Sequence, residues 1–528
     1  MMQPFDSRAH AVWFRFCAVC LAVYMAYAAW LSNSFFLMET SKTIIALGVF
    51  AALAALLYGV FMQLGRKKAF FALPLHPREK NDLRVFLSAF GIALAIFGCA
   101  FAACYPGGVN YDISNQWRQA HSGEFNNWHP LFHTILIWLA VQAADSYPVV
   151  LLMQIVVFAA AMAWLAAVVH RAGIPAWLVL VVHALTAASP PVRNALMYVG
   201  KDSAMTIGVM LLTAQTIRML FSRGEWLRKP VNAVCFGALL ALTTLLRHNA
   251  MMWTWVLLAA VFFCWKKMRG QTALAAGVMA VILALVQGPL YGALDVVYPD
   301  NLTDESLGIP MTVLGDVKQL DPDALDEETH AFLNTLASDE EWQQTYRLHN
   351  YNSIKFTFDR EYVARRAPGE ILSMAARAAA AAPRTAFEAV NGLTDLVWGL
   401  SGENEAAPSV RNSGHIPEAA YGSAKLNALG GRLLGMLDAV MNLPPIRYVQ
   451  QNIGVMFLLF LLTTLWTLRC SGVCALVPAL PALAYNLGTM LLLASNDARF
   501  FQYFMTTAPF YMLALIYLPK ENEHAGNA

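Results

Sequence analysis

The sequence predicts an all-α fold, a polytopic membrane bundle of about 12 transmembrane helices with interfacial helices and one large extracytoplasmic helical segment. Three observations predict this fold. Apolar residues make up 58% of the 528 residues and charged residues only 13%, whereas a soluble domain carries about 25% charged residues. Twelve apolar runs approach the roughly 20 residues that a spanning helix needs. The polar residues gather in a few segments between these runs.

The apolar runs divide the chain into four parts. Residues 1–83 form an N-terminal two-span module with a basic loop, residues 84–292 the main bundle, residues 293–448 a large polar segment, and residues 449–528 a three-span closure. The runs cover residues 12–32, 43–64, 84–104, 148–169, 175–190, 203–221, 231–247, 250–266, 273–292, 449–468, 473–494 and 500–518.

The basic residues predict how this bundle is oriented. With a cytoplasmic N-terminus, the inner segments hold eighteen Lys and Arg, including the clusters at 65–68 and 266–269, against six in the short outer loops. Because cytoplasmic loops carry the excess of Lys and Arg, we expect a multi-pass protein of the cell inner (plasma) membrane. Both termini are then cytoplasmic, and residues 105–147, 190–202 and 293–448 lie outside.

The apolar stretch 130–146 is short and begins at Pro130. If it crossed the membrane, every later loop would change sides and the basic clusters would face out, against the charge rule. We therefore expect an interfacial or re-entrant helix here.

The segment 293–448 opens with an acidic stretch that contains "TDES" and "LDPDALDEE". Asp or Thr ahead of Pro and acidic residues are typical of helix starts, so we expect several short helices. Residues 361–391 are rich in Ala and partly amphipathic, which predicts a helix on the membrane surface. Residues 401–414 read as an exposed loop.

Polar and ionisable residues gather at the predicted outer ends of the spans, where they are costly and usually functional. They fall into four stretches: "YPGGVNYDISNQWRQAHSGEFNNWHPLFHT", "SPPVRNALMYVGKDS", "LLRHNAMMW" and "ASNDARFFQY". From these, Asp112 and Asp202 are the candidate catalytic residues. The candidate substrate-binding residues are Gln116, Trp128, His129, Arg193, Lys201, Arg247, His248, Asn249 and Arg499.

These residue types favour a phosphorylated sugar as the ligand. Carboxylates such as Asp112 and Asp202 serve as general bases or bind a divalent cation such as Mg or Mn. The guanidinium groups of Arg247 and Arg499 match phosphate oxygens, and Trp128 can stack on a sugar ring. Together they suit a lipid-linked phosphosugar at the outer leaflet.

Each candidate also has a structural alternative. Asp112 could cap a helix, since "YDISNQWRQA" resembles a helix start, and His129 could only begin the helix at Pro130. Asp202 could form a salt bridge with Lys201 or Arg193. Arg247, near the end of a span, could reach toward lipid headgroups.

The outer stretches resemble the GT-C class of membrane glycosyltransferases, which includes protein O-mannosyltransferases and aminoarabinose transferases. The resemblance is carried by Asp112 in "NYDISNQWRQAHSG", by "NNWHPLFHTIL", and by Asp202 in "VGKDSAMTIGVMLLT". A less characterised bacterial group within this class is closer still, through "GIPMTVLGDVKQLDPDALDEE" and "YNSIKFTF". The chain departs from the class in having "HPL" instead of "HPP" and a single acid at Asp112.

The resemblance implies a GT-C-like fold and an inverting transfer from a polyprenyl-phosphate sugar to an envelope glycan, lipid or protein, with Asp112 as the candidate base and Asp202 assisting. The partners are then the bilayer, the lipid-linked donor and the acceptor, and no nucleic acid. Three other functions remain open. They are an envelope polysaccharide polymerase or ligase, a transporter or flippase for lipid-linked substrates, and a non-catalytic assembly protein.

Overall fold

The computed structural model describes residues 7–31, 40–66, 82–299, 306–358, 360–401, 409–422 and 428–516. Within these ranges all regular elements are helices, and β-structure is limited to isolated bridges. The prediction of an all-α fold is therefore confirmed. Parts of the basic clusters, including Lys67, Lys68, Arg78 and Lys80, lie outside the described residues.

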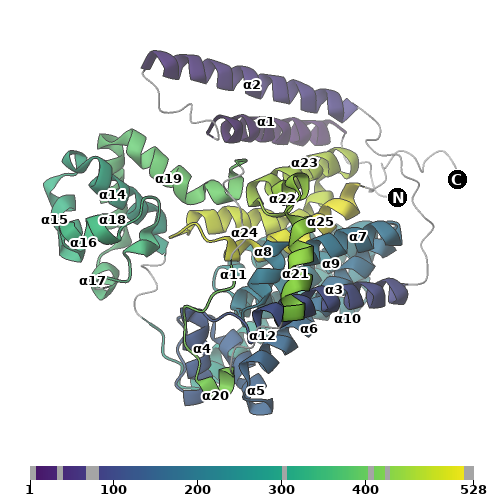
Figure 1. Cartoon of the computed structure of the whole chain (residues 1–528). Coiled ribbons are helices and arrows are strands. Elements are labelled where there is room, and N and C mark those ends of the chain that lie inside the picture. Colours follow the sequence, from purple (N-terminus) through teal and green to yellow (C-terminus); the bar gives the residue numbers. More distant parts are fainter. Residues whose placement is uncertain are drawn as a thin grey trace.

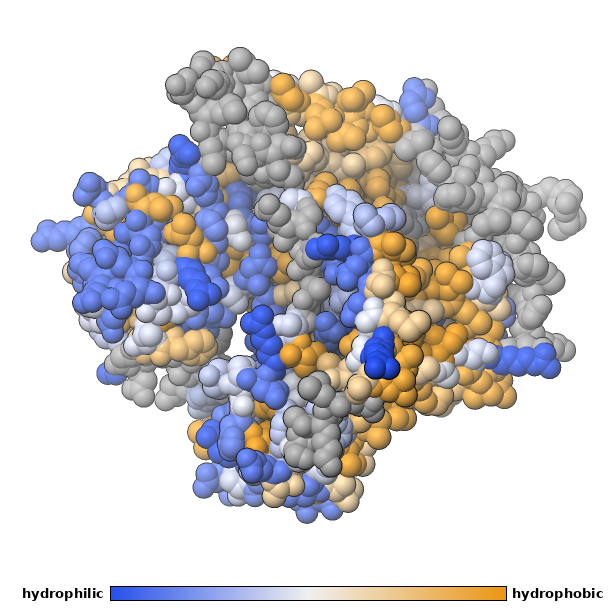
Figure 2. All heavy atoms as spheres, viewed as in Figure 1, coloured by the Kyte–Doolittle hydropathy of each residue, from blue (hydrophilic) through white to orange (hydrophobic). Residues whose placement is uncertain are grey.

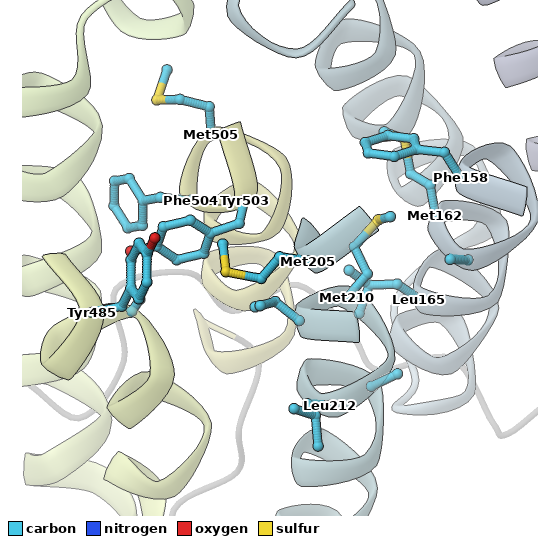
Figure 3. Packing of buried hydrophobic residues seen from close by; sticks show 14 of the residues in the cluster. Phe158, Met162, Leu165, Met205, Met210, Leu212, Tyr485, Tyr503, Phe504 and Met505 are labelled. Carbon is cyan, nitrogen blue, oxygen red and sulfur yellow. The ribbon is translucent and has the colours of Figure 1, made fainter. Parts of the chain in front are cut away.

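The bundle is built around α6 (Tyr147–Arg171), which packs against α3 (Asp82–Cys104) on one side and α9 (Lys201–Phe221) on the other. α25 (Gln502–Ile516) packs in turn against α9 and α23 (Ile453–Ser471) (Figure 1). Ala159, Ala163 and Ala166 of α6 are fully buried, and such small residues let helices approach closely. Side chains of α6, α9, α24 (Leu480–Leu491) and α25 form the core seen in Figure 3.

All twelve apolar runs coincide with helices. Besides those just named they form α1 (Ser7–Leu31), α2 (Thr40–Arg66), α7 (Ala176–Ala188), α10 (Pro230–Leu246), α11 (Ala250–Cys264) and α12 (Arg269–Leu285). By length and composition, five described helical segments could span a membrane: Val12–Ala29, Asp82–Cys104, Tyr147–Arg171, Lys201–Phe221 and Lys266–Ala293. The pair α7 and α8 (Pro190–Leu196), bent by 59°, would be a sixth. The count of twelve spans stays a prediction.

Two helices occupy the predicted outer loop 105–147. α4 (Tyr111–Ser122) packs on α5 (Leu131–Ala143), and the buried Gln116 joins them. Its Nε2 donates to Thr134 Oγ1 at 3.1 Å, and its Oε1 lies 3.2 Å from His133 Nδ1. The 13 residues of α5 extend about 20 Å, short of the roughly 30 Å hydrocarbon core. This length fits an interfacial or re-entrant helix.

Residues 306–398 form a helical lobe beside the bundle, with its own hydrophobic core (Figure 1). Its helices are α14 (Gly308–Leu320), α15 (Glu327–Leu336), α16 (Asp339–Thr345), α17 (Arg360–Arg365), α18 (Pro368–Ala381) and α19 (Pro383–Trp398). The expected series of short helices is thus present. Hydrophilic residues cover much of this lobe in Figure 2. α18 buries Ile371, Met374 and Ala378 in the lobe core, so its apolar face packs on protein, although the sequence predicted a membrane-surface helix.

The chain returns from the lobe to the bundle through three helices, α20 (Glu418–Tyr421), α21 (Ala428–Met441) and α22 (Pro444–Gln450). α21 packs along α3. Gly430 makes this approach possible, since a Cβ there would lie 2.8 Å from the Ala102 Cβ. The returning chain therefore belongs to the bundle surface. The lobe has its own core up to Ala389, and the end of α19 packs in the bundle core through Leu393 and Trp398.

Candidate functional site: a charged cluster around Asp112

Asp112 lies in the first turn of α4 and does not cap it. The cap is Asn110, whose side-chain oxygen accepts a hydrogen bond of 2.9 Å from the Ile113 amide. Asn is among the preferred N-cap residues. Because Asn110 satisfies the helix start, the Asp112 carboxylate is left for other partners.

Three side chains from distant parts of the sequence surround the Asp112 carboxylate. Lys201 Nζ, at the start of α9, donates to Oδ2 at 3.1 Å, and Arg499 Nη1 donates to the same oxygen at 3.3 Å. His129 Nε2 lies 3.8 Å from Oδ1. We call Asp112, His129, Lys201 and Arg499 the Asp112 cluster. The cluster has an open side, because 28% of the Asp112 side chain and 32% of the Arg499 side chain are exposed.

The cluster fixes the charge of its members. Burial alone would raise the pKa of the Asp112 carboxyl, but Lys201 and Arg499 outweigh burial and hold that pKa far below its usual range. Burial, followed by the charge of Lys201, lowers the pKa of His129 to about 3. His129 is therefore neutral near pH 7. Its Nδ1 accepts a 2.9 Å hydrogen bond from Lys201 Nζ, which assigns the ring proton to Nε2, the nitrogen facing Asp112.

A second ion pair adjoins the Asp112 cluster through Phe500. Arg247 pairs with Asp202, the residue after Lys201. The guanidinium carbon of Arg247 lies 4.8 Å from the centre of the Phe500 ring, and that of Arg499 lies 5.1 Å from it. Phe500 thus links the two arginines. Asp202 is paired with Arg247, and neither Lys201 nor Arg193 is its partner in this structure.

Three more of the candidate residues border this site. The His248 ring hydrogen-bonds to the backbone of Asn127 and Trp128, which ties the loop before α11 to the loop before α5. The side-chain oxygen of Asn249 is buried and has no hydrogen-bond partner among the described residues.

Gln116 and Arg193 are used elsewhere. Both amide ends of Gln116 are engaged between α4 and α5. Arg193 is buried, pairs with Asp438 of α21, and donates to the Ala188 carbonyl at 3.2 Å. The structure gives both residues roles in packing and does not bring them to the carboxylate of Asp112.

A strap formed by residues 409–416 lies across the start of α4. Asn412 Oδ1 accepts from the Val109 amide at 3.1 Å, and the amides of Ser413 and Gly414 donate to the Val109 carbonyl at 2.9 and 3.1 Å. The His415 amide donates to Ser114 Oγ at 2.6 Å. Most of the strap is exposed, as expected for this stretch, and residues 402–408 of the predicted loop lie outside the described residues. The strap also holds the helix that carries Asp112.

Gly414→Ala should loosen this strap. An added Cβ would lie 2.3 Å from both the Asn110 carbonyl oxygen and Ser114 Oγ, and overpacking of this kind costs about 1–3 kcal/mol. We expect a lower Tm for the detergent-solubilised chain. Gly431→Ala is the matched control, because nothing lies within 4 Å of its Cβ. An unchanged Tm for Gly414→Ala would contradict the close contact with α4.

His129→Gln should reduce the loss of stability in acid. The unfolded chain, with an ordinary His pKa of about 6.5, binds a proton that buried His129, with its pKa lowered to about 3, does not bind. Proton uptake by His129 in the unfolded chain therefore lowers the stability of the wild type as the pH drops below about 6.5. We expect the fall in Tm between about pH 7.5 and about pH 5 to be smaller in His129→Gln than in wild type.

His121→Gln provides a control of opposite sign. Burial would lower the pKa of His121, but hydrogen bonds to the Trp117 carbonyl and to Asp145 outweigh it and raise that pKa. His121 therefore stabilises the fold at acid pH, and this contribution is lost as the pH rises through its folded-state pKa. His121→Gln should show the larger acid fall in Tm. Equal falls in both variants would contradict the assigned charge of His129.

The residues around Asp112 do not fit the Mg or Mn ion that the sequence left open. Among the described residues, no group of three or more His, Cys, Asp and Glu is placed to hold a metal ion. The nearest charges to Asp112 are the cations Lys201 and Arg499, which would repel a divalent ion. The positive charges of Lys201 and Arg499 already balance the negative charge of the Asp112 carboxylate.

Sequence reasoning missed Phe500, Asn110 and the strap. Phe500 directly follows Arg499 in "NDARFF", and an aromatic residue beside an arginine could have indicated it. Asn110 precedes α4 in "VNYD", and an Asn just before a helix could have indicated the cap. The strap carries no such signal, because Asn412 is 303 residues from Val109.

A scan of protein-family models, a search of curated proteins and a search of solved structures found no match to this chain.

Proposed function

We propose that the chain is a membrane glycosyltransferase of the GT-C type. It moves a sugar from a polyprenyl-phosphate donor to an envelope glycan, lipid or protein acceptor, with inversion at the anomeric carbon. The observation that carries the proposal is the meeting of Lys201 and Arg499 at the Asp112 carboxylate, with Arg247 linked through Phe500. The carboxylate could act on the acceptor hydroxyl, and the cations could bind the phosphate that leaves.

The cations suit a phosphate leaving group. As the bond between the anomeric carbon and the phosphate oxygen breaks, negative charge grows on the phosphate. Donors already aimed at that charge lower the barrier without reorganising. Arg499 and Lys201 would contact the phosphate directly, and Arg247 would add a third charge across Phe500. The polyprenyl chain would lie along the apolar helices of the bundle.

Asp112 would act on the acceptor hydroxyl. In this structure its pKa is held down by Lys201 and Arg499, so it binds a proton weakly. A bound phosphate would share the positive charge of those two residues, and the proton affinity of Asp112 would rise. Asp112 could then orient the hydroxyl and take its proton as the oxygen bonds to the anomeric carbon. Asp202 would act indirectly, by holding Arg247 in place.

The proposal also assigns the site to one side of the membrane, the side that the distribution of basic residues favours. The Asp112 cluster would lie at the extracytoplasmic face of the inner (plasma) membrane, both termini in the cytoplasm, and the lobe outside. The strap and lobe would cover the acceptor side of the site.

A donor screen with the purified chain tests the proposal. Polyprenyl-phosphate monosaccharides should be consumed, with release of polyprenyl phosphate and transfer of the sugar to envelope glycan, lipid or protein acceptors. Consumption of polyprenyl-diphosphate oligosaccharides alone would assign the chain to the polymerases or ligases. Movement of the intact donor across proteoliposomes without cleavage would instead assign it to the transporters. Either result would contradict the proposal.

A further inference from the structure

A second polar site lies at the opposite end of α9 from Lys201. An open cavity of about 550 Å³ is lined by the ends of α6 and α9, by the short helix η2 (Glu225–Arg228) and by the start of α10. The 21 residues of α9 extend about 31 Å, so this cavity is far from the Asp112 cluster. The proposed transfer makes no use of it.

The cavity presents unbalanced positive charge. Arg171, Arg218 and Lys229 line it. Asp82 pairs with Arg171, and Glu225, the acidic residue of the lining, pairs at 3.5 Å with Arg228, which is outside the lining. Asp82 is also close enough to act on Arg218, so one carboxylate faces two arginines. Among the described residues, Lys229 has no carboxylate partner.

Arg218 is held in place but unsatisfied. Its guanidinium carbon lies 4.7 Å from the centre of the Trp164 ring, a distance that fits a cation–π contact. Its Nε is buried and has no hydrogen-bond partner among the described residues. A buried donor without a partner is destabilising. Arg218 also lines the cavity, where its charge attracts an anion.

The remaining walls are apolar. They come from Val168, Ala172, Ile217, Phe221 and Trp226. A small inorganic anion gains nothing from such walls, whereas an anion attached to a hydrocarbon chain buries apolar surface there. α6 and α9, which supply these walls, are both long and apolar enough to span a membrane, so lipid would lie beside the cavity.

We propose that this cavity binds the phosphate group of an anionic lipid, with Arg218 and Lys229 contacting the phosphate and the apolar walls contacting the adjoining glycerol or hydrocarbon. Inorganic phosphate shares the charged chemistry but lacks the apolar part. The site is independent of the proposed glycosyl transfer, because no residue of the Asp112 cluster lines it.

The test measures lipid binding to the full-length chain in detergent by native mass spectrometry. The probes are phosphatidylglycerol, zwitterionic phosphatidylcholine and inorganic phosphate. Arg218→Gln should weaken phosphatidylglycerol binding by about ten- to a hundred-fold, the range expected for a lost charged hydrogen bond. Arg223→Gln is the matched control, since Arg223 is exposed and outside the cavity lining. It should leave binding unchanged.

Three results would overturn the proposal. One is equal binding of phosphatidylglycerol by Arg218→Gln and Arg223→Gln, and another is equal binding of phosphatidylcholine and phosphatidylglycerol by wild type. The third is displacement of the lipid by inorganic phosphate at similar concentration, which would identify a free-phosphate site. If Arg218→Gln does not yield folded protein, Lys229→Gln replaces it with the same expected direction, because Lys229 is exposed. Sugar transfer measured in parallel reports on the Asp112 cluster alone.

Discussion

Asp112→Asn should reduce sugar transfer by about 10²–10⁴-fold, the range that a positioned general base contributes. The change keeps the shape of the side chain and removes its charge and its capacity to accept a proton. Lys201 and Arg499 would then face each other without the carboxylate that both contact. We expect the main loss in kcat, with a smaller change in KM, measured as release of polyprenyl phosphate from a polyprenyl-phosphate sugar.

Asp145→Asn is the matched control for Asp112. Asp145 follows α5, its side chain is 57% exposed, and its partner is His121, outside the Asp112 cluster. This variant should keep wild-type turnover. Full activity in Asp112→Asn, with a Tm equal to that of wild type, would show that Asp112 is not the group that handles the acceptor hydroxyl.

Arg499→Gln should lower kcat/KM by about 10²–10³-fold, the usual effect of removing one donor aimed at developing charge. Arg499 contacts Asp112 and Asp497 and lies over Phe500, so its loss removes a phosphate contact and also frees Asp112. The variant should therefore show weakened binding of polyprenyl phosphate as well as slow transfer. Binding can be measured by competition against the donor.

The control for Arg499 is Arg118→Gln. Arg118 is exposed on α4, the helix that carries Asp112, and it should contribute little to either rate or binding. An Arg499→Gln variant that binds polyprenyl phosphate as well as Arg118→Gln does would remove Arg499 from the proposed phosphate site.

Much of the fold could be predicted because its signals are local. An apolar run of sufficient length becomes a helix wherever it packs, and all twelve runs did so. The short run at 130–146 formed α5, and its 13 residues fit the predicted interfacial or re-entrant helix. What local signals cannot give is the packing of the return chain, so the contact of α21 with α3 was not foreseen.

The candidate site was predictable in its residue types more than in its contacts. Asp112 is 89 residues from Lys201 and 387 from Arg499, and only the shared predicted outer face connected them. The same reasoning included Gln116 and Arg193, because residue type does not distinguish a polar side chain that packs between helices from one that faces a ligand. Burial and hydrogen-bond partners separate the two cases, and neither can be read from one sequence.

The cations beside Asp112 also change the chemistry expected of that carboxylate. The sequence left open a carboxylate that binds a divalent ion, whereas Lys201 and Arg499 already provide its countercharge. These two cations therefore favour ionised Asp112. In the proposed mechanism a bound phosphate draws those cations away, which couples binding of the donor to the basicity of the group that acts on the acceptor.

The most direct test of the central claim is a structure of the full-length chain with polyprenyl phosphate bound. We expect the phosphate to contact Arg499 and Lys201, within reach of Arg247, with the carboxylate of Asp112 open to the acceptor side. A phosphate bound only in the cavity beside Arg218, with the Asp112 cluster unchanged, would contradict it.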